Sequence, residues 1–123
     1  MIKGVLLAES LRLDAAVAVP GLQLHSVRRR DVSDSTTDEQ PEIWTFIEFV
    51  APDSVSPQLA RALSSALRAD GGWYADYSTG EDRVIVFAGR VFQYPRGDVP
   101  GRAAAQAYGL SVGIPEHQLD WPD

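Results

Sequence analysis

Cysteine is absent from this chain, and lysine, methionine and histidine are scarce. Without cysteine the protein can form no disulfide framework, no cysteine nucleophile and no thiolate metal site. The only two histidines, His25 and His117, lie far apart and in no metal-ligand spacing, so we expect no metal and no other cofactor. The lack of disulfides agrees with a reducing compartment.

Long apolar runs are also missing. No stretch approaches the ~20 apolar residues of a membrane span, and the apolar run near the N-terminus is too short for a signal peptide. The formal net charge of −6 repels nucleic acid and anionic membranes on average. We therefore expect a cytoplasmic protein that binds no membrane and for which nucleic acid is an unlikely partner. Arg28, Arg29 and Arg30 form the one local basic run, typical of an anion or partner contact or of a solvated strand end.

What is present is typical of an ordinary globular protein. The 123 residues suit one domain of common size, and 45% are hydrophobic and 23% charged. We expect a single α+β domain over residues 1–123.

Apolar patterning and turn signals predict the order β-β-β-α-β-β-β-α. Strands are expected at residues 4–8, 22–30, 43–50, 73–78, 83–88 and 91–94. One helix is expected to follow Ser56 as its N-cap and to end before Gly71. A second helix is expected at about 100–108, with Asp98 as its cap and Gly109 as its stop. The polar segment 33–41 is expected to be an exposed, disordered loop.

These elements predict a mainly antiparallel sheet of five to six strands with both helices on one face. The strand at 43–50 is apolar on both faces and should be central, and the strand at 83–88 is apolar on both faces too. Two helices can cover only one face, so the N-terminal strands, a ligand or a second subunit must cover the other. Because a large exposed apolar face is unusual in a monomer, we predict a homodimer through that face.

Two carboxylates are the candidates for catalysis. Glu48 and Asp76 each lie within an aromatic, apolar strand, where desolvation raises a carboxyl pKa and suits it to general acid or base catalysis. If their strands are neighbours and the residues share a face, they form an acid–base pair. The alternative is that each faces solvent or forms a structural ion pair, with Arg83, Arg90 or Arg96 as partner.

The candidates for binding are aromatic residues and arginines. Trp73 and Tyr74, with three further aromatic side chains, are typical of a stacking platform or, alternatively, of a core and its cross-strand pairs. The further aromatic residues are Tyr77, Phe92 and Tyr94. Arg83 and Arg96 are candidates for holding an anionic substrate.

Four segments carry a resemblance that spans most of the chain: residues 4–12, 72–76, 91–95 and 111–121. Together they resemble a family of small uncharacterised bacterial proteins. The resemblance implies one domain that includes the C-terminal tail, where Trp121 is expected to dock, and it implies no particular activity.

Two functions follow as hypotheses. The first is a non-enzymatic binding or protein-interaction module with an unidentified protein or small-molecule partner. The second is a small enzyme that uses Glu48 or Asp76 as a general acid or base on an anionic small molecule. A deep pocket containing both carboxylates favours the enzyme, and a flat apolar face with both in ion pairs favours the module.

Overall fold

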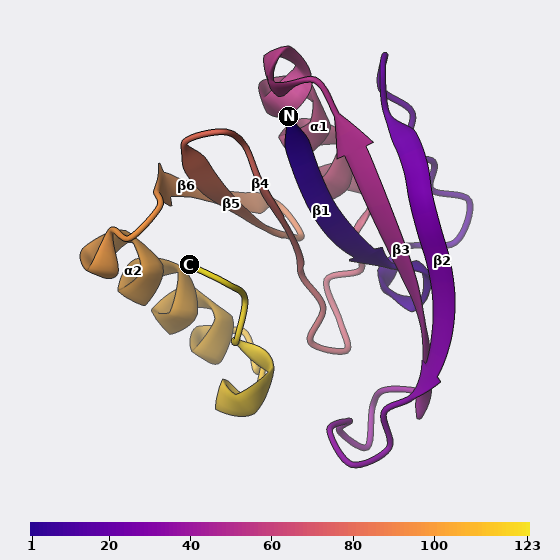
Figure 1. The fold of residues 1–123 in the computed structure, drawn as a ribbon. Coiled ribbons are helices and arrows are strands. Elements are labelled where there is room, and N and C mark those ends of the chain that lie inside the picture. The colour runs from indigo at the N-terminus through magenta and orange to yellow at the C-terminus, as the bar shows by residue number, and fades with distance from the viewer.

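The computed structural model describes residues 1–123 and contains one six-stranded sheet with two α-helices (Figure 1). The strands are β1 (Ile2–Leu7), β2 (Gln23–Asp31), β3 (Ile43–Ala51), β4 (Ala75–Ser78), β5 (Asp82–Phe87) and β6 (Arg90–Pro95), and the helices are α1 (Ser56–Ala66) and α2 (Val99–Ser111). The predicted α+β class and element order are confirmed. Neither helix is long and apolar enough to span a membrane.

The strands lie in the order β2-β3-β1-β4-β5-β6, and every neighbouring pair is antiparallel. Strand β3 lies between β2 and β1, as its two apolar faces predict. Strand β1 lies between β3 and β4. We call β2, β3 and β1 the N-terminal half of the sheet, and β4, β5 and β6 the C-terminal half.

Helix α1 covers one face of the sheet, which we call the α1 face. Its Leu59 and Leu63, one turn apart, are buried in a cluster with residues of β1, β3, β4 and β5. Ser56 is the first residue of the helix rather than its N-cap, and its hydroxyl hydrogen-bonds with the Tyr77 hydroxyl at 2.9 Å. The predicted N-cap is therefore wrong, because the Ser56 hydroxyl hydrogen-bonds with the buried phenol of Tyr77 and not with a backbone N–H of the first turn.

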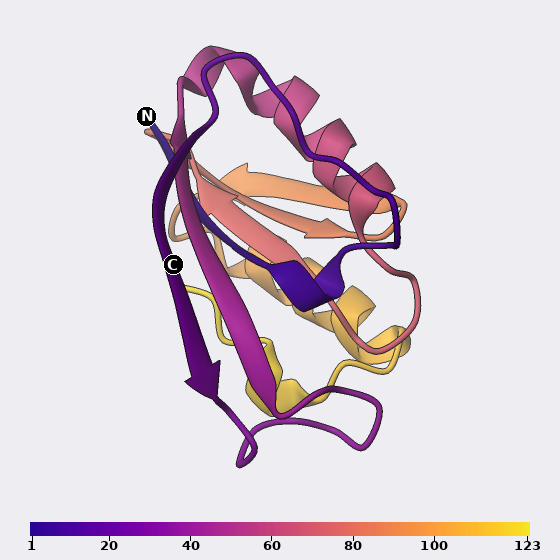
Figure 2. The ribbon, with the colours of Figure 1, turned by 90° about the vertical axis from the view of Figure 1, so that its right-hand side faces the viewer.

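Helix α2 lies on the opposite face, which we call the α2 face (Figure 2). Along β5, Val84 and Val86 pack in the cluster with α1, whereas Ile85 and Phe87 pack with α2 and the C-terminal tail. Successive residues of a strand point to opposite faces, so a strand that is apolar on both faces needs a cover on each. The prediction that both helices share one face is therefore wrong. The homodimer prediction loses its premise at β5, since one chain supplies both covers.

Helix α2 also ends later than predicted. Gly109, the expected stop, lies inside the helix, where a Cβ would be only 2.6 Å from Leu119 Cδ2. Glycine at this position lets the C-terminal tail pack closely on the helix. The cap prediction is confirmed, because Asp98 Oδ1 accepts a hydrogen bond from the Gly101 N–H at 3.4 Å.

The C-terminal tail is bound to the polar segment 33–41. Gln118 Nε2 donates to the Ser35 carbonyl at 2.8 Å and to Gln40 Oε1 at 2.9 Å, and Gln40 is buried. The expectation of an exposed loop is thus wrong at Gln40. Trp121 is 3% exposed and its Nε1 donates to the Tyr94 hydroxyl at 2.6 Å, so its predicted docking is confirmed.

Candidate functional site

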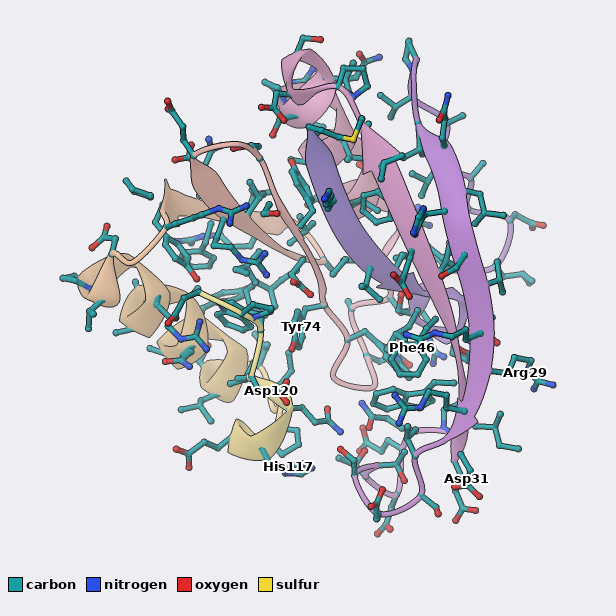
Figure 3. All side chains as sticks on the ribbon, in the orientation of Figure 1. Arg29, Asp31, Phe46, Tyr74, His117 and Asp120 are labelled. Carbon is teal, nitrogen blue, oxygen red and sulfur yellow. The ribbon has the colours of Figure 1, made fainter.

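A cleft of about 560 Å³ opens on the α2 face, where no helix covers the N-terminal half of the sheet (Figure 3). One wall consists of β1 and β3, and the other of β4, the start of β5 and the tail from His117 to Pro122. We call this cavity the sheet–tail cleft. It exists because α2 and the tail cover only the C-terminal half of this face.

Strand β3 contributes alternate side chains to the cleft. Trp44, Phe46 and Glu48 line it, as the two-residue period of a strand requires. Phe46 is half-buried, and the guanidinium of Arg30 on β2 lies 5.9 Å from its ring centre.

Trp73 and Tyr74 lie at the opposite wall. The Trp73 ring meets Trp44 edge to face at 5.3 Å, and the Tyr74 ring meets Trp121 edge to face at 5.4 Å. The Tyr74 hydroxyl donates to the Gln118 carbonyl. Burial raises the pKa of Tyr74 above its ordinary value, so the phenol stays protonated at neutral pH and holds the tail against β4.

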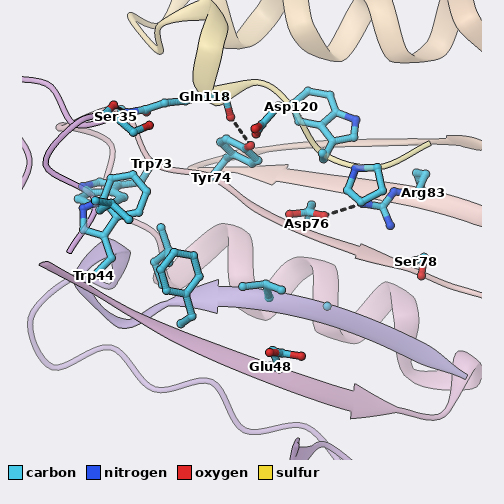
Figure 4. Close-up of a pocket in the computed structure, with 18 of the residues that line it drawn as sticks. Ser35, Trp44, Glu48, Trp73, Tyr74, Asp76, Ser78, Arg83, Gln118 and Asp120 are labelled. Carbon is cyan, nitrogen blue, oxygen red and sulfur yellow. Dashed lines mark hydrogen bonds and ion pairs between the residues drawn. The ribbon is translucent and has the colours of Figure 1, made fainter. Parts of the chain in front are cut away.

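Glu48 and Asp76 both line the cleft, but their strands are not neighbours (Figure 4). Val5 of β1 pairs with Glu48 on one side and with Asp76 on the other. At a strand spacing of about 4.8 Å, their Cα atoms lie about 10 Å apart. The condition for an acid–base pair, that the two strands are neighbours, is therefore not met, and the carboxylates make no direct contact.

Each carboxylate instead has an arginine partner. Asp76 Oδ2 accepts from Arg83 Nη2 at 2.6 Å, and Glu48 Oε1 accepts from Arg28 Nη2 at 3.0 Å. Arg83 was one of the three expected partners, whereas Arg28 comes from the basic run. Burial raises the pKa of Asp76, and the nearby Asp120 carboxylate raises it further, while Arg83 acts in the opposite direction.

Arg83 is the most buried charged group of the cleft, with 5% of the residue exposed. A guanidinium has five N–H donors. One of them, on Nη2, is used by Asp76, and the buried Nε has no partner. The cleft therefore contains a buried cation with donor capacity to spare.

Several other predicted binding residues lie elsewhere. Arg96 is exposed outside the cleft and donates to the Thr79 carbonyl at 2.9 Å. Tyr77 is buried on the α1 face, and Phe92 and Tyr94 pack on the α2 side of β6. The expected aromatic platform is therefore divided between two faces.

Lys3 and Asp120 also line the cleft, and neither was among the predicted site residues. Their only signal is position: Lys3 alternates with Val5 on β1, and Asp120 precedes the docked Trp121. No group of three histidine, aspartate or glutamate residues is arranged to hold a metal ion.

The sequence matches no protein-family model, and no curated protein or solved structure shows significant similarity to it. The resemblance to a family of small bacterial proteins stays a prediction. The cleft is therefore the feature of this protein that bears on its function.

Proposed function

We propose that this protein is a non-enzymatic binding module whose ligand is a small molecule held in the sheet–tail cleft. The observation that carries the proposal is the cleft itself: about 560 Å³ between a sheet and a docked tail, open on one side, with aromatic and charged side chains on both walls. Ligand sites of soluble proteins have volumes of about 300–1,000 Å³ and combine apolar walls with a few convergent polar groups.

The arrangement of the carboxylates supports binding rather than turnover. Glu48 and Asp76 are each occupied by an arginine, so each carboxylate already has a hydrogen-bonding partner within the protein. The chain has no cysteine, and no serine stands in a nucleophile-elbow sequence. The cleft thus offers recognition groups without an activated nucleophile.

One observation favours the enzyme as a second candidate. Asp76 and Glu48 point into one cleft, and burial raises the pKa of Asp76, which is how proteins prepare a general acid. Asp76→Asn and Glu48→Gln separate the two functions. In an enzyme both variants abolish product formation although ligand still binds, whereas in a binding module the ligand is recovered unchanged from the wild-type protein.

A thermal-shift screen against metabolites, nucleotides, sugars and amines tests the proposal. A ligand at a hundred times its dissociation constant stabilises the protein by about 2.7 kcal/mol, which raises the Tm of a domain of this size by about 5–10 °C. Glu48→Gln should weaken the shift, and the matched control Glu81→Gln, on an exposed turn, should leave it unchanged. A hit that responds equally to both variants contradicts binding in the cleft.

A homodimer, a protein partner and a cytoplasmic location stay part of the proposal. Light scattering at micromolar concentration tests the homodimer, and a strictly monomeric species contradicts it. Affinity capture from the host cell tests a protein partner, and cell fractionation tests the location.

A further inference from the structure

We infer that the ligand of the sheet–tail cleft is an uncharged carbohydrate. The inference depends on the proposed function, because it names the chemical class of the molecule that the cleft binds. Three independent features of the cleft carry it: the balance of charges, the pairing of donors with acceptors, and the position of the partly exposed rings.

The charges of the cleft disfavour an ion of either sign. Three carboxylates line it, those of Glu48, Asp76 and Asp120, together with the cations of Lys3 and Arg83. Since Arg28 pairs with Glu48 and Arg83 with Asp76, the charges balance, and an ion of either sign meets no net opposite charge. An uncharged ligand keeps the Asp76–Arg83 ion pair intact and leaves no buried charge without a partner.

The hydrogen-bonding groups of the cleft match hydroxyl groups. An ionised carboxylate only accepts hydrogen bonds and a guanidinium only donates them, whereas a hydroxyl does both. At the Asp76–Arg83 pair the two kinds of group lie 2.6 Å apart. Two adjacent hydroxyls match this pair in kind, one donating to the carboxylate and the other accepting from a terminal N–H of Arg83 that Asp76 does not use.

Ser78 extends this polar patch. It pairs with Arg83 across β4 and β5 and with Lys3 across β1 and β4, and it lines the cleft although only 7% of the residue is exposed. Its hydroxyl can donate and accept like those of the ligand. Asp76, Ser78, Arg83 and Lys3 thus form a compact set that can contact several hydroxyls of one ring.

The apolar part of the cleft suits the C–H face of a sugar ring. Phe46 and Tyr74 are only partly buried and lie on opposite walls (Figure 3). Val5 and Leu7 of β1, the strand between β3 and β4, also line the cleft. Of the 20 lining residues, 8 are hydrophobic. Nine of the 20 carry polar side chains. A ligand that is apolar all over gives these nine no hydrogen-bonding partner, which costs free energy, whereas a sugar presents both surfaces.

A glycan array followed by titration calorimetry tests the inference with the full chain. We expect binding to at least one neutral glycan, and a loss of about tenfold or more when the same sugar carries an amino or a carboxylate group. Phe46→Ala should weaken binding by about tenfold, which corresponds to the loss of one stacked ring. Arg96→Ala, outside the cleft, should not change it.

The possible failures are distinguishable. If Asp76→Asn does not fold, Glu48→Gln, whose arginine partner is exposed, serves as the polar variant and should also weaken binding. Neutral glycans that all fail while an amine, a carboxylate or a nucleoside binds in a Glu48-dependent manner overturn the carbohydrate inference and leave the proposed function standing. Failure of every class of compound overturns the proposed function itself. If neither Phe46→Ala nor Glu48→Gln changes the affinity for a glycan, that glycan does not bind in the sheet–tail cleft.

Discussion

The two halves of the sheet have different covers. The C-terminal half is enclosed between α1 and α2, and five of the six residues of β5 are buried. The N-terminal half is covered mainly on its α1 face, and β2 is an edge strand whose nine residues include none that is buried. The comparison indicates that the C-terminal half is the more completely buried part of the sheet, and that the uncovered α2 face of the N-terminal half leaves room for the cleft.

The largest expected difference between the halves is in packing. Phe87 of β5 is 2% exposed and contacts the rings of Tyr74, Phe92 and Tyr108. Phe87→Ala should lower the free energy of unfolding by about 3–5 kcal/mol. Val27 of β2 is 52% exposed, and Val27→Ala should change it by less than about 0.5 kcal/mol. Urea denaturation measures both, and equal costs contradict the division into two halves.

The two ion pairs, one in each half of the sheet, should also differ in their contribution to stability, by a smaller amount. Asp76→Ala leaves the buried Arg83 without a partner, so it should cost about 3 kcal/mol. Glu48→Ala releases Arg28, whose side chain is 59% exposed, and should cost less than about 1 kcal/mol. The double variant with Arg83→Leu should recover part of the loss at Asp76. No recovery means that the cost does not come from an unpaired guanidinium.

The next largest effect on stability is expected at Gly4 of β1, the strand that adjoins the C-terminal half of the sheet. A Cβ at Gly4 of β1 would lie 2.5 Å from both Phe49 Cζ and Tyr77 Cβ. Gly4→Ala should therefore cost about 1–3 kcal/mol through overpacking. Gly80→Ala is the control, because the nearest atom to its Cβ, Asp53 Oδ2, is 3.3 Å away. An unchanged urea midpoint for Gly4→Ala means that the strands move apart without cost.

Local signals in the sequence predicted the elements well. Runs of β-branched and aromatic residues mark β3 and β5, and Gly89 has the φ of +73° that its hairpin turn requires. Asp98 caps α2 as expected. What local patterns could not show is which face each helix covers. Because β5 has apolar side chains on both faces, each face must be covered by another part of a protein. The sequence pattern does not show whether the same chain covers the second face.

The candidate site was predictable only in part, for the same reason. Glu48, Asp76, Trp73, Tyr74 and Arg83 were all selected by residue type within apolar strands, and all line the cleft. Their arrangement depends on the insertion of β1 between β3 and β4, which is a non-local pairing without a sequence signal. The rest of the cleft wall, from β1 and the tail, follows from that same pairing.

The smallest expected effect is the dependence of stability on pH. Folding shifts the carboxyl pKa in opposite directions at the buried Asp76 and the exposed Asp70. Because burial raises the pKa of Asp76 above 3.8, the folded protein takes up this proton before the unfolded chain does as the pH falls. The contribution of Asp76 to stability therefore rises with falling pH, from its raised pKa down to about 3.8, and is lost again as the pH rises. Hydrogen bonds from Arg68 lower the pKa of the exposed Asp70, so its contribution to stability is present above pH 3.8 and is lost below it.

Urea midpoints from pH 7 to pH 3 should rise more in the wild type than in Asp76→Asn through the window above pH 3.8. Asp70→Asn should keep the wild-type rise in that window and differ only below it. If the urea midpoints of the wild type and of Asp76→Asn change with pH in parallel, the pKa of Asp76 is the same in the folded and unfolded states. Solvent then reaches this carboxylate more than its burial indicates.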